Sequence, residues 1–198
     1  MFAYRPIALL AAGFISLLIS GCTSPTFTRP ERTGIEQLLL STAVDNALAK
    51  IVLVELEGEK VFVDDSYLDS YDVNYVKGAI RAKLSDSGVI LVATAEEADV
   101  VVEPRCGGLG VDPSKSLLGI PSLPIPVVGT TVTETPELVI YGKEAMDSLT
   151  TIAILAYDRK GKQILSTKPS IGKSYFHNYK FLLLVHINFT DIKAREDY

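Results

Sequence analysis

The spacing of hydrophobic residues changes several times along this chain, and the changes predict a mixed α/β domain. From Gly34 to Lys50, apolar residues recur at the three- and four-residue spacing of an amphipathic helix, which Thr33 can cap. A second such helix is predicted after Ser70 or Asp72, ending at Ser87-Gly88. Runs typical of buried strands lie at residues 61–63, 89–93 and 98–104. This alternation indicates one mixed sheet packed by two or more helices, in a single three-layer-like α/β (α+β) domain.

Residues 104–136 interrupt the pattern with six prolines, five glycines and almost no charge. We therefore predict a long Gly/Pro-rich apolar loop inserted into the domain. Strand patterns resume in "PELVIYG", "SLTTIAILAYD" and "KQILSTKPSIG". The predicted domain spans residues 34–190, and the charged residues 191–198 are predicted to form a loose tail.

The N-terminal segment has the order of a secretory signal, with one basic residue followed by an apolar run that is short for a membrane span. The run ends in "ISGC", residues 19–22, which resembles the lipobox of bacterial lipoproteins. The resemblance implies that the signal peptide, residues 1–21, is removed. It also implies that the Cys22 thiol carries a diacylglycerol and that the new amino group is acylated, as with palmitate. Two or more acyl chains give stable membrane anchoring.

The residues that follow the lipobox place this anchor more closely. Thr23 stands where an Asp would mark retention in the inner membrane, so the resemblance implies the outer membrane, with the domain in the periplasm. The polar, proline-containing stretch 22–33 is predicted to be a lipidated tether.

Composition narrows the class of partner. Acidic side chains outnumber basic ones by 24 to 19, and the formal net charge is −5. Clustered basic residues, which nucleic-acid binding requires, are missing from the sequence, so no nucleic-acid partner is predicted. If Cys22 is lipidated, Cys106 has no second cysteine for an internal disulfide. Cys106 is then either a small buried apolar residue or a link to another chain, which leaves homo-oligomerisation open.

Several phrases together resemble a known group of envelope proteins. "VDDSYLD", "GVILVATAEEADVVVEPRCGGLG" and "IAILAYDRKGKQILST" resemble the core of periplasmic lipoproteins built like the amino-terminal domain of TolB. That group includes the curli secretion lipoprotein and the activators of penicillin-binding proteins. "ERTGIEQLLLSTAVDNAL" is similar to the opening of an uncharacterised family of small bacterial lipoproteins. The resemblance implies an architecture and an envelope location, while the role must come from the site.

Four acids offer the strongest candidate for chemistry. Asp64, Asp65, Asp69 and Asp72 follow a predicted strand, where open α/β sheets often bind ligands. Clustered carboxylates can bind a divalent ion or raise one another's pKa values, but this spacing lacks the central glycine and distal Glu of a calcium loop. Helix capping and solvation are the competing explanation.

Two shorter patterns are incomplete. "TKPSIGKS" has Thr167 where a phosphate-binding loop needs glycine, and Ser170 and Lys173 match S-x-x-K without its companion motifs. No catalytic residue, metal ligand or cofactor is therefore predicted.

The charge-free stretch 116–129 is the strongest candidate for binding a protein. Exposed apolar residues usually mark a partner or a membrane, although this stretch could also fold back over its own sheet. The predicted contact residues are Leu117, Leu118, Ile120, Leu123 and Ile125. The sequence thus predicts a membrane-anchored, non-catalytic envelope accessory or assembly factor. The alternative is a periplasmic small-ligand or divalent-ion binding domain, or a weak hydrolase, centred on residues 64–72.

Overall fold

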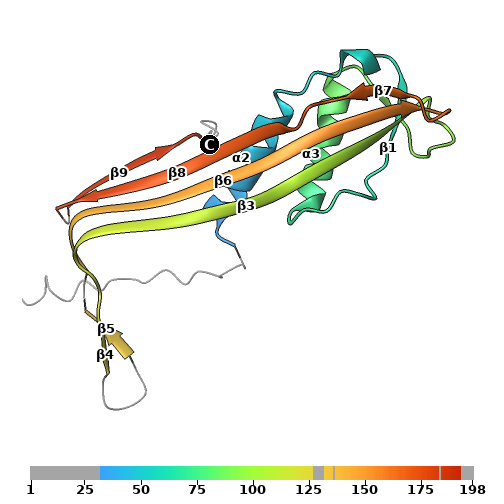
Figure 1. Cartoon of the computed structure of the whole chain (residues 1–198). Helices are drawn as coiled ribbons and strands as arrows, with labels where there is room; N and C mark the ends of the chain where they lie inside the picture. Colours follow the sequence, from blue (N-terminus) through green and yellow to red (C-terminus); the bar gives the residue numbers. More distant parts are fainter. Residues whose placement is uncertain (1–31, 127–131, 136, 183, 193–198) are drawn as a thin grey trace, which may run out of the picture. The chain divides into compact units, whose positions relative to one another are not determined.

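The computed structural model describes residues 32–126, 132–135, 137–182 and 184–192 (Figure 1). The predicted signal peptide, Cys22 and most of the predicted tether lie outside these residues, as do 193–198 of the predicted tail. Two α-helices are described, α2 (Gly34–Leu48) and α3 (Val73–Asp86), with a short 3₁₀ helix at Val54–Leu56. The strands are β1 (Lys60–Val63), β2 (Ile90–Leu91), β3 (Val100–Ile120), β4 (Pro124–Pro126), β5 (Val132–Glu134), β6 (Leu138–Asp158), β7 (Gln163–Ser166), β8 (Ser170–Phe181) and β9 (Val185–Thr190).

The main sheet has the order β2-β1-β3-β6-β8-β9, with β7 also paired to β6. β1 runs parallel to β2 and β3, and the other pairs of this sheet are antiparallel. β4 and β5 form a separate two-stranded sheet. The prediction of one mixed sheet packed by helices is therefore confirmed.

Both helices pack on the same face of the main sheet, which we call the helical face (Figure 1). Val44, Ile80, Val102 and Ile154 represent α2, α3, β3 and β6, which meet in one core cluster with β1 and the 3₁₀ helix. The opposite face is called the open face, because no helix of the described residues covers it. The described part of the chain thus has two layers where three were expected.

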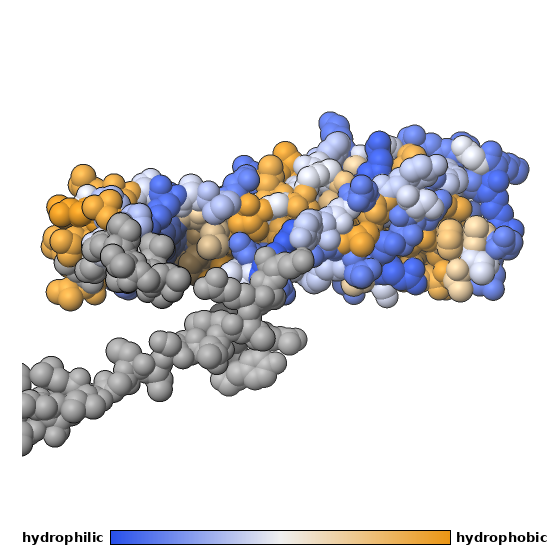
Figure 2. Space-filling view, turned by 90° about the horizontal axis from the view of Figure 1, so that it is seen from below, coloured by the Kyte–Doolittle hydropathy of each residue, from blue (hydrophilic) through white to orange (hydrophobic). Residues whose placement is uncertain are grey.

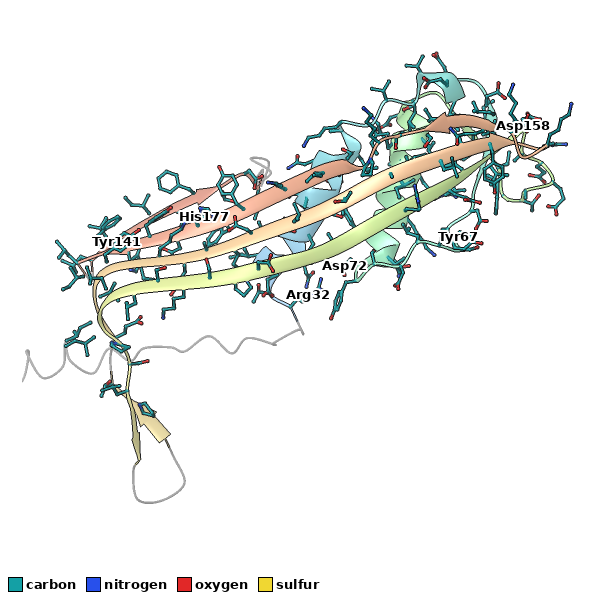
Figure 3. All side chains as sticks on the ribbon, viewed as in Figure 1. Arg32, Tyr67, Asp72, Tyr141, Asp158 and His177 are labelled. Carbon is teal, nitrogen blue, oxygen red and sulfur yellow. The ribbon has the colours of Figure 1, made fainter. Side chains whose placement is uncertain are left out.

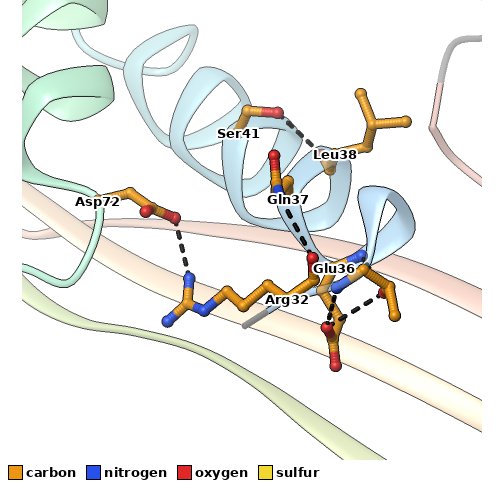
Figure 4. A network of polar contacts seen from close by, with 7 residues as sticks. Arg32, Glu36, Gln37, Leu38, Ser41 and Asp72 are labelled. Carbon is orange, nitrogen blue, oxygen red and sulfur yellow. Dashed lines mark hydrogen bonds and ion pairs between the residues drawn. The ribbon is translucent and has the colours of Figure 1, made fainter. Parts of the chain in front are cut away.

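Helix α2 begins and packs as its sequence predicts. The Thr33 hydroxyl accepts a hydrogen bond from the Glu36 backbone N–H, and the Glu36 carboxylate accepts one from the Thr33 N–H, which completes a capping box (Figure 4). The buried positions of α2 recur at helical spacing. Gly172 on β8 permits close packing, because a Cβ there would collide with the backbone of Ala43 and would lie 2.7 Å from the Ala47 nitrogen.

The expected loop over residues 104–136 is wrong for its first half. β3 continues to Ile120 and pairs with β6 almost residue by residue. β1 pairs only with Val100–Val102, so the rest of β3 has a strand on one side only, and prolines are tolerated on such an edge. Gly107 and Gly108 lie at a register shift, where Gly108 takes a φ of +60° that suits glycine.

Candidate contact surface on the open face

The three long strands β3, β6 and β8 align their side chains in rows across the open face. One row is formed by Leu118, Tyr141, Phe181 and Val185, which are partners in the strand register. The next rows follow the same pairing, because successive side chains on one face are two residues apart. They contain Lys143, Tyr179 and Ile187, and then Ala145, His177 and Phe189.

Aromatic rings dominate the part of this face formed by β8 and β9. We call Tyr175, His177, Tyr179 and Phe189 the aromatic row. Adjacent ring centroids lie 5.2 Å apart for Tyr175 and His177, 6.5 Å for His177 and Tyr179, and 5.7 Å for Tyr179 and Phe189. These are the separations of favourable tilted and edge-to-face pairs, so the rings support one another in fixed positions.

Two side chains of β6, Asp147 and Lys143, contact rings of the aromatic row. The His177 Nε2 lies 3.0 Å from an Asp147 carboxylate oxygen, and Figure 3 shows His177 and Tyr141 on the same half of the sheet. The Lys143 ammonium lies 5.7 Å from the centroid of the Tyr179 ring, within the range of a cation–π contact. The surface is thus apolar in its rings and charged beside them.

The aromatic row is partly accessible, since His177 and Tyr179 are half-buried and its other two rings are exposed. Tyr175 is 39% exposed and Phe189 is 54% exposed. Ile187, beside them on β9, is 41% exposed. Sequence reasoning missed this surface, although a signal was present: in "SYFHNYKF", aromatic residues and His177 alternate with a period of two.

The five predicted contact residues lie around the far end of β3. Leu118 and Ile120 are 62% and 56% exposed and lie on the open face, whereas Leu117 is half-buried and points to the helical face. Leu123, just before β4, is 54% exposed. Ile125 lies in β4, and its side chain is outside the described part.

Exposed apolar residues gather where β3 and β8 end and β6 and β9 begin. We call this group of residues the apolar tip. Figure 2 shows the hydrophobic surface at this end of the sheet. Exposure rises from 36% at Phe181 to 89% at Leu184. The apolar tip consists of Leu118, Ile120, Leu138, Ile140, Phe181, Leu182, Leu184 and Val185.

The four predicted acids each have a different environment. Asp64 accepts hydrogen bonds from the hydroxyl and the backbone N–H of Ser66, which lower the pKa of its carboxyl. Asp65 pairs with Lys77 at 2.8 Å.

Asp72 pairs with Arg32 at 2.9 Å, as Figure 4 shows, and Asp69 is exposed. Within the described residues, no three His, Cys, Asp or Glu side chains gather in an arrangement suited to a metal ion. The structure therefore does not bring these acids together into one site.

The other sequence candidates have structural roles. The Ser170 hydroxyl donates a hydrogen bond of 2.8 Å to the Ala47 carbonyl, which ties β8 to α2. Lys173 lies three residues further along the strand, and its side chain therefore projects from the opposite face. Cys106 is half-buried against the core, 3.4 Å from the Thr150 hydroxyl, and it forms no disulfide in the described structure.

None of the helices in the described residues is both long and apolar enough to cross a membrane.

Comparison with known proteins gives one family. Residues 15–171 match the model of a family of unknown function, DUF6655. No curated protein matches the chain. Among solved structures, the chain resembles the crystal structure of a minor lipoprotein from Acinetobacter baumannii, with 14% identity, a TM-score of 0.27 and coverage of 69% of this chain and 72% of that one. The resemblance to TolB-like lipoproteins stays a prediction.

Proposed function

We propose that this chain, which belongs to the DUF6655 family of unknown function, is a lipid-anchored bacterial envelope protein that works by binding another envelope protein. In this proposal Cys22 carries the lipid, the anchor lies in the outer membrane, and the domain faces the periplasm. The protein is an accessory or assembly factor, and its action is noncovalent.

The observation that carries this proposal is the aromatic row on the open face. A monomeric soluble protein rarely exposes a large contiguous apolar surface unless a partner or a membrane covers it. Tyr and Phe are also enriched at the centres of protein interfaces. The rings of Tyr179 and Phe189 are already packed edge to face, so little side-chain entropy is lost when a partner binds them.

The charges beside the row favour a protein partner of mixed character. Lys143 lies over Tyr179, while Asp147 lies beside His177. An interface with an apolar centre and charged groups at its margin is the usual anatomy of a specific, non-obligate complex.

The contacts of the acids and of Ser170 also support a binding role. Asp65 and Asp72 each hold a basic partner, and the Ser170 hydroxyl donates a hydrogen bond to a backbone carbonyl of α2. Each group stabilises the fold in the described structure. No specific observation favours the alternative of a ligand site at residues 64–72.

Crosslinking in intact Gram-negative cells tests the proposal. The full-length chain with a C-terminal tag is compared with three variants: Cys22→Ala, the double variant Tyr179→Ser/Phe189→Ser, and Val52→Ser. Val52 is a matched control, because it is an apolar residue that is 66% exposed outside the open face.

The expected result is one envelope protein that crosslinks to the wild type and to Val52→Ser, and that is lost in the other two variants. Tyr179 is half-buried and Phe189 is 54% exposed, and neither belongs to the core cluster, so the double variant should fold with only a small drop in melting temperature. Recovery of a second copy of this chain instead would identify the partner as itself. Equal crosslinking of the wild type and the double variant would refute the open face as the binding surface.

A further inference from the structure

We infer that the apolar tip inserts into the interfacial layer of a lipid bilayer. This goes beyond the proposed function, which concerns the open face, and it rests on that function only for the anchor at Cys22. The bilayer would hold the sheet by its end, with Tyr179 at the level of the headgroups, and would leave Tyr175, His177 and Phe189 of the aromatic row in the aqueous phase.

The turn between β8 and β9 contains residue types that are unusual in hairpin turns. Hairpin turns favour Gly, Asn and Asp, which tolerate positive φ angles and solvate well. Here Leu182 takes a φ of 46°, a conformation that bulky residues rarely adopt, and it is 68% exposed. Leu184 is 89% exposed. An unfavourable conformation combined with exposed leucine side chains indicates selection for an apolar turn.

The ends of the neighbouring strands extend this turn into a broader surface. Leu138 and Ile140 on β6 are 47% and 57% exposed. Leu118 and Ile120 on β3 are similarly exposed, at 62% and 56%. The chain that continues from Ile120 to Pro126 carries no charged residue. The tip therefore presents apolar side chains from the β8–β9 turn and from the ends of β3 and β6, and none of the residues that form it is charged.

Behind the tip, the order of side chains is that of a membrane interface. The first row holds Tyr141 against Phe181, with ring centroids 5.4 Å apart, and the next row holds Lys143 beside Tyr179. Two residues along a strand span about 7 Å. Aromatic rings and lysines set this far behind an apolar end match the headgroup region, where a buried apolar face penetrates about 5–10 Å.

The helical face has its charges at a similar depth. Lys180 pairs with Glu144 at 2.9 Å, and Lys115 pairs with Glu137 at 3.0 Å. These ion pairs form a polar band just behind the tip and set a limit to insertion. A protein partner would require no such ordering of apolar, aromatic and charged rows along the strand direction, so the ordering favours a lipid surface.

The predicted tether can extend about as far as β3 extends beyond the core. Leu109 is the last β3 residue packed against the core, and the nine residues from it to Leu118 span about 30 Å. The ten residues from Cys22 to Arg32 can extend to about 35 Å. An anchor and an apolar contact together provide the two signals that stable membrane association requires.

A fluorescent probe in the full-length, lipidated protein tests the inference. The background variant Cys106→Ser removes the free thiol, and Leu184→Cys then carries an environment-sensitive dye. The matched control is Lys160→Cys, an exposed turn residue beyond the opposite end of β6, near Asp158 in Figure 3. Both proteins are reconstituted in phosphatidylethanolamine/phosphatidylglycerol vesicles, with and without lipids spin-labelled near the headgroup.

The expected result is spin-label quenching about twofold stronger at Leu184 than at Lys160, because only the tip reaches the acyl chains. Equal, weak quenching in protein that floats with the vesicles would overturn the inference and leave the anchor intact. Dye shielded from water but unquenched by lipid would also overturn it, since this indicates contact between tips of two copies. Protein that does not float at all would refute both the anchor and the tip insertion.

A charge at the tip provides an independent measurement. Leu184→Glu changes a side chain that is almost fully exposed, so the fold should be retained. In the Cys22→Ala background, the wild-type tip should leave weak vesicle binding that Leu184→Glu removes. Vesicle binding that is unchanged by Leu184→Glu would contradict insertion of the tip.

Discussion

The contact between Asp45 and Tyr75 illustrates how single side chains join the two helices. The Tyr75 hydroxyl donates to both oxygens of the Asp45 carboxylate, at 3.1 and 2.9 Å. Burial and then the adjacent carboxylate raise the Tyr75 pKa to about 12. On the open face, a hydrogen bond of 2.6 Å to Glu103, followed by burial, raises the Tyr157 pKa to about 12 as well. Both phenols are stabilised in their neutral form.

This stabilisation gives a prediction for alkaline pH. Because the folded-state pKa of Tyr75 lies above the unfolded value of 10, its contribution is complete below pH 10 and is lost as the pH rises towards 12. Ultraviolet titration should show two late-ionising phenols, one of which disappears in Tyr75→Phe while that of Tyr157 remains. Asp45→Asn should bring the Tyr75 ionisation to lower pH, because the facing negative charge is removed. An unchanged titration curve in Asp45→Asn would show that the pair does not form in solution.

At the scale of the elements, the packing of α2 on β8 depends on Gly172, which has no side chain. Gly172 faces the α2 backbone, and Asn46 and Lys50 donate hydrogen bonds from α2 to backbone carbonyls of β8 at 2.8 and 2.7 Å. The helix and the strand are therefore in backbone contact at one point and are joined by hydrogen bonds around it.

Gly172→Ala should accordingly destabilise the protein strongly. The added Cβ would collide with α2 and force the helix away from the sheet, at a cost of about 3 kcal/mol or more. Gly110→Ala is the matched control, because Gly110 lies in β3 and has no atom within 4 Å of an added Cβ. Urea unfolding of both variants measures the difference. Similar midpoints for the two would mean that α2 does not pack closely on Gly172.

Some of these elements could be predicted from the sequence and others could not. Helix α2 was predicted correctly, with Thr33 as its cap, because periodicity and capping are local signals. The far half of β3 was not, because Pro104, Pro113 and the Gly107-Gly108 pair are local signals for a loop. What overrides them is pairing with β6 along a single edge, and such a partner lies too far along the chain for local patterns to reveal.

For the candidate surface, the sequence indicated the apolar end of β3 but not its neighbours. Leu118, Tyr141 and Phe181 share one row only because strand register aligns them. Register depends on the pairing of whole strands, so the rows were not readable from composition. The alternation of rings in β8 was visible in the sequence, and it indicates one face of a strand once β8 is known to be a strand.

At the scale of the whole molecule, helix α2 depends on strand β8, which lies more than 120 residues further along the chain. Truncation after Phe181 removes β9, which pairs only with β8, and should leave a cooperative unfolding transition. Truncation after Lys168 also removes β8 and leaves much of the apolar face of α2 without its partner, so cooperative unfolding should be lost. Circular dichroism during thermal unfolding distinguishes the two. A cooperative transition in the shorter chain would contradict the role assigned to β8.

This dependence also sets the order of events in biosynthesis. Asn46 and the carbonyl of Lys173 that it binds are 127 positions apart, so α2 leaves the ribosome long before its packing surface has been made. A 15-residue helix is only marginally stable alone. The nascent chain therefore cannot complete its core until β8 has been synthesised. That delay keeps the polypeptide threadable, which is the state a protein-conducting channel requires of its cargo.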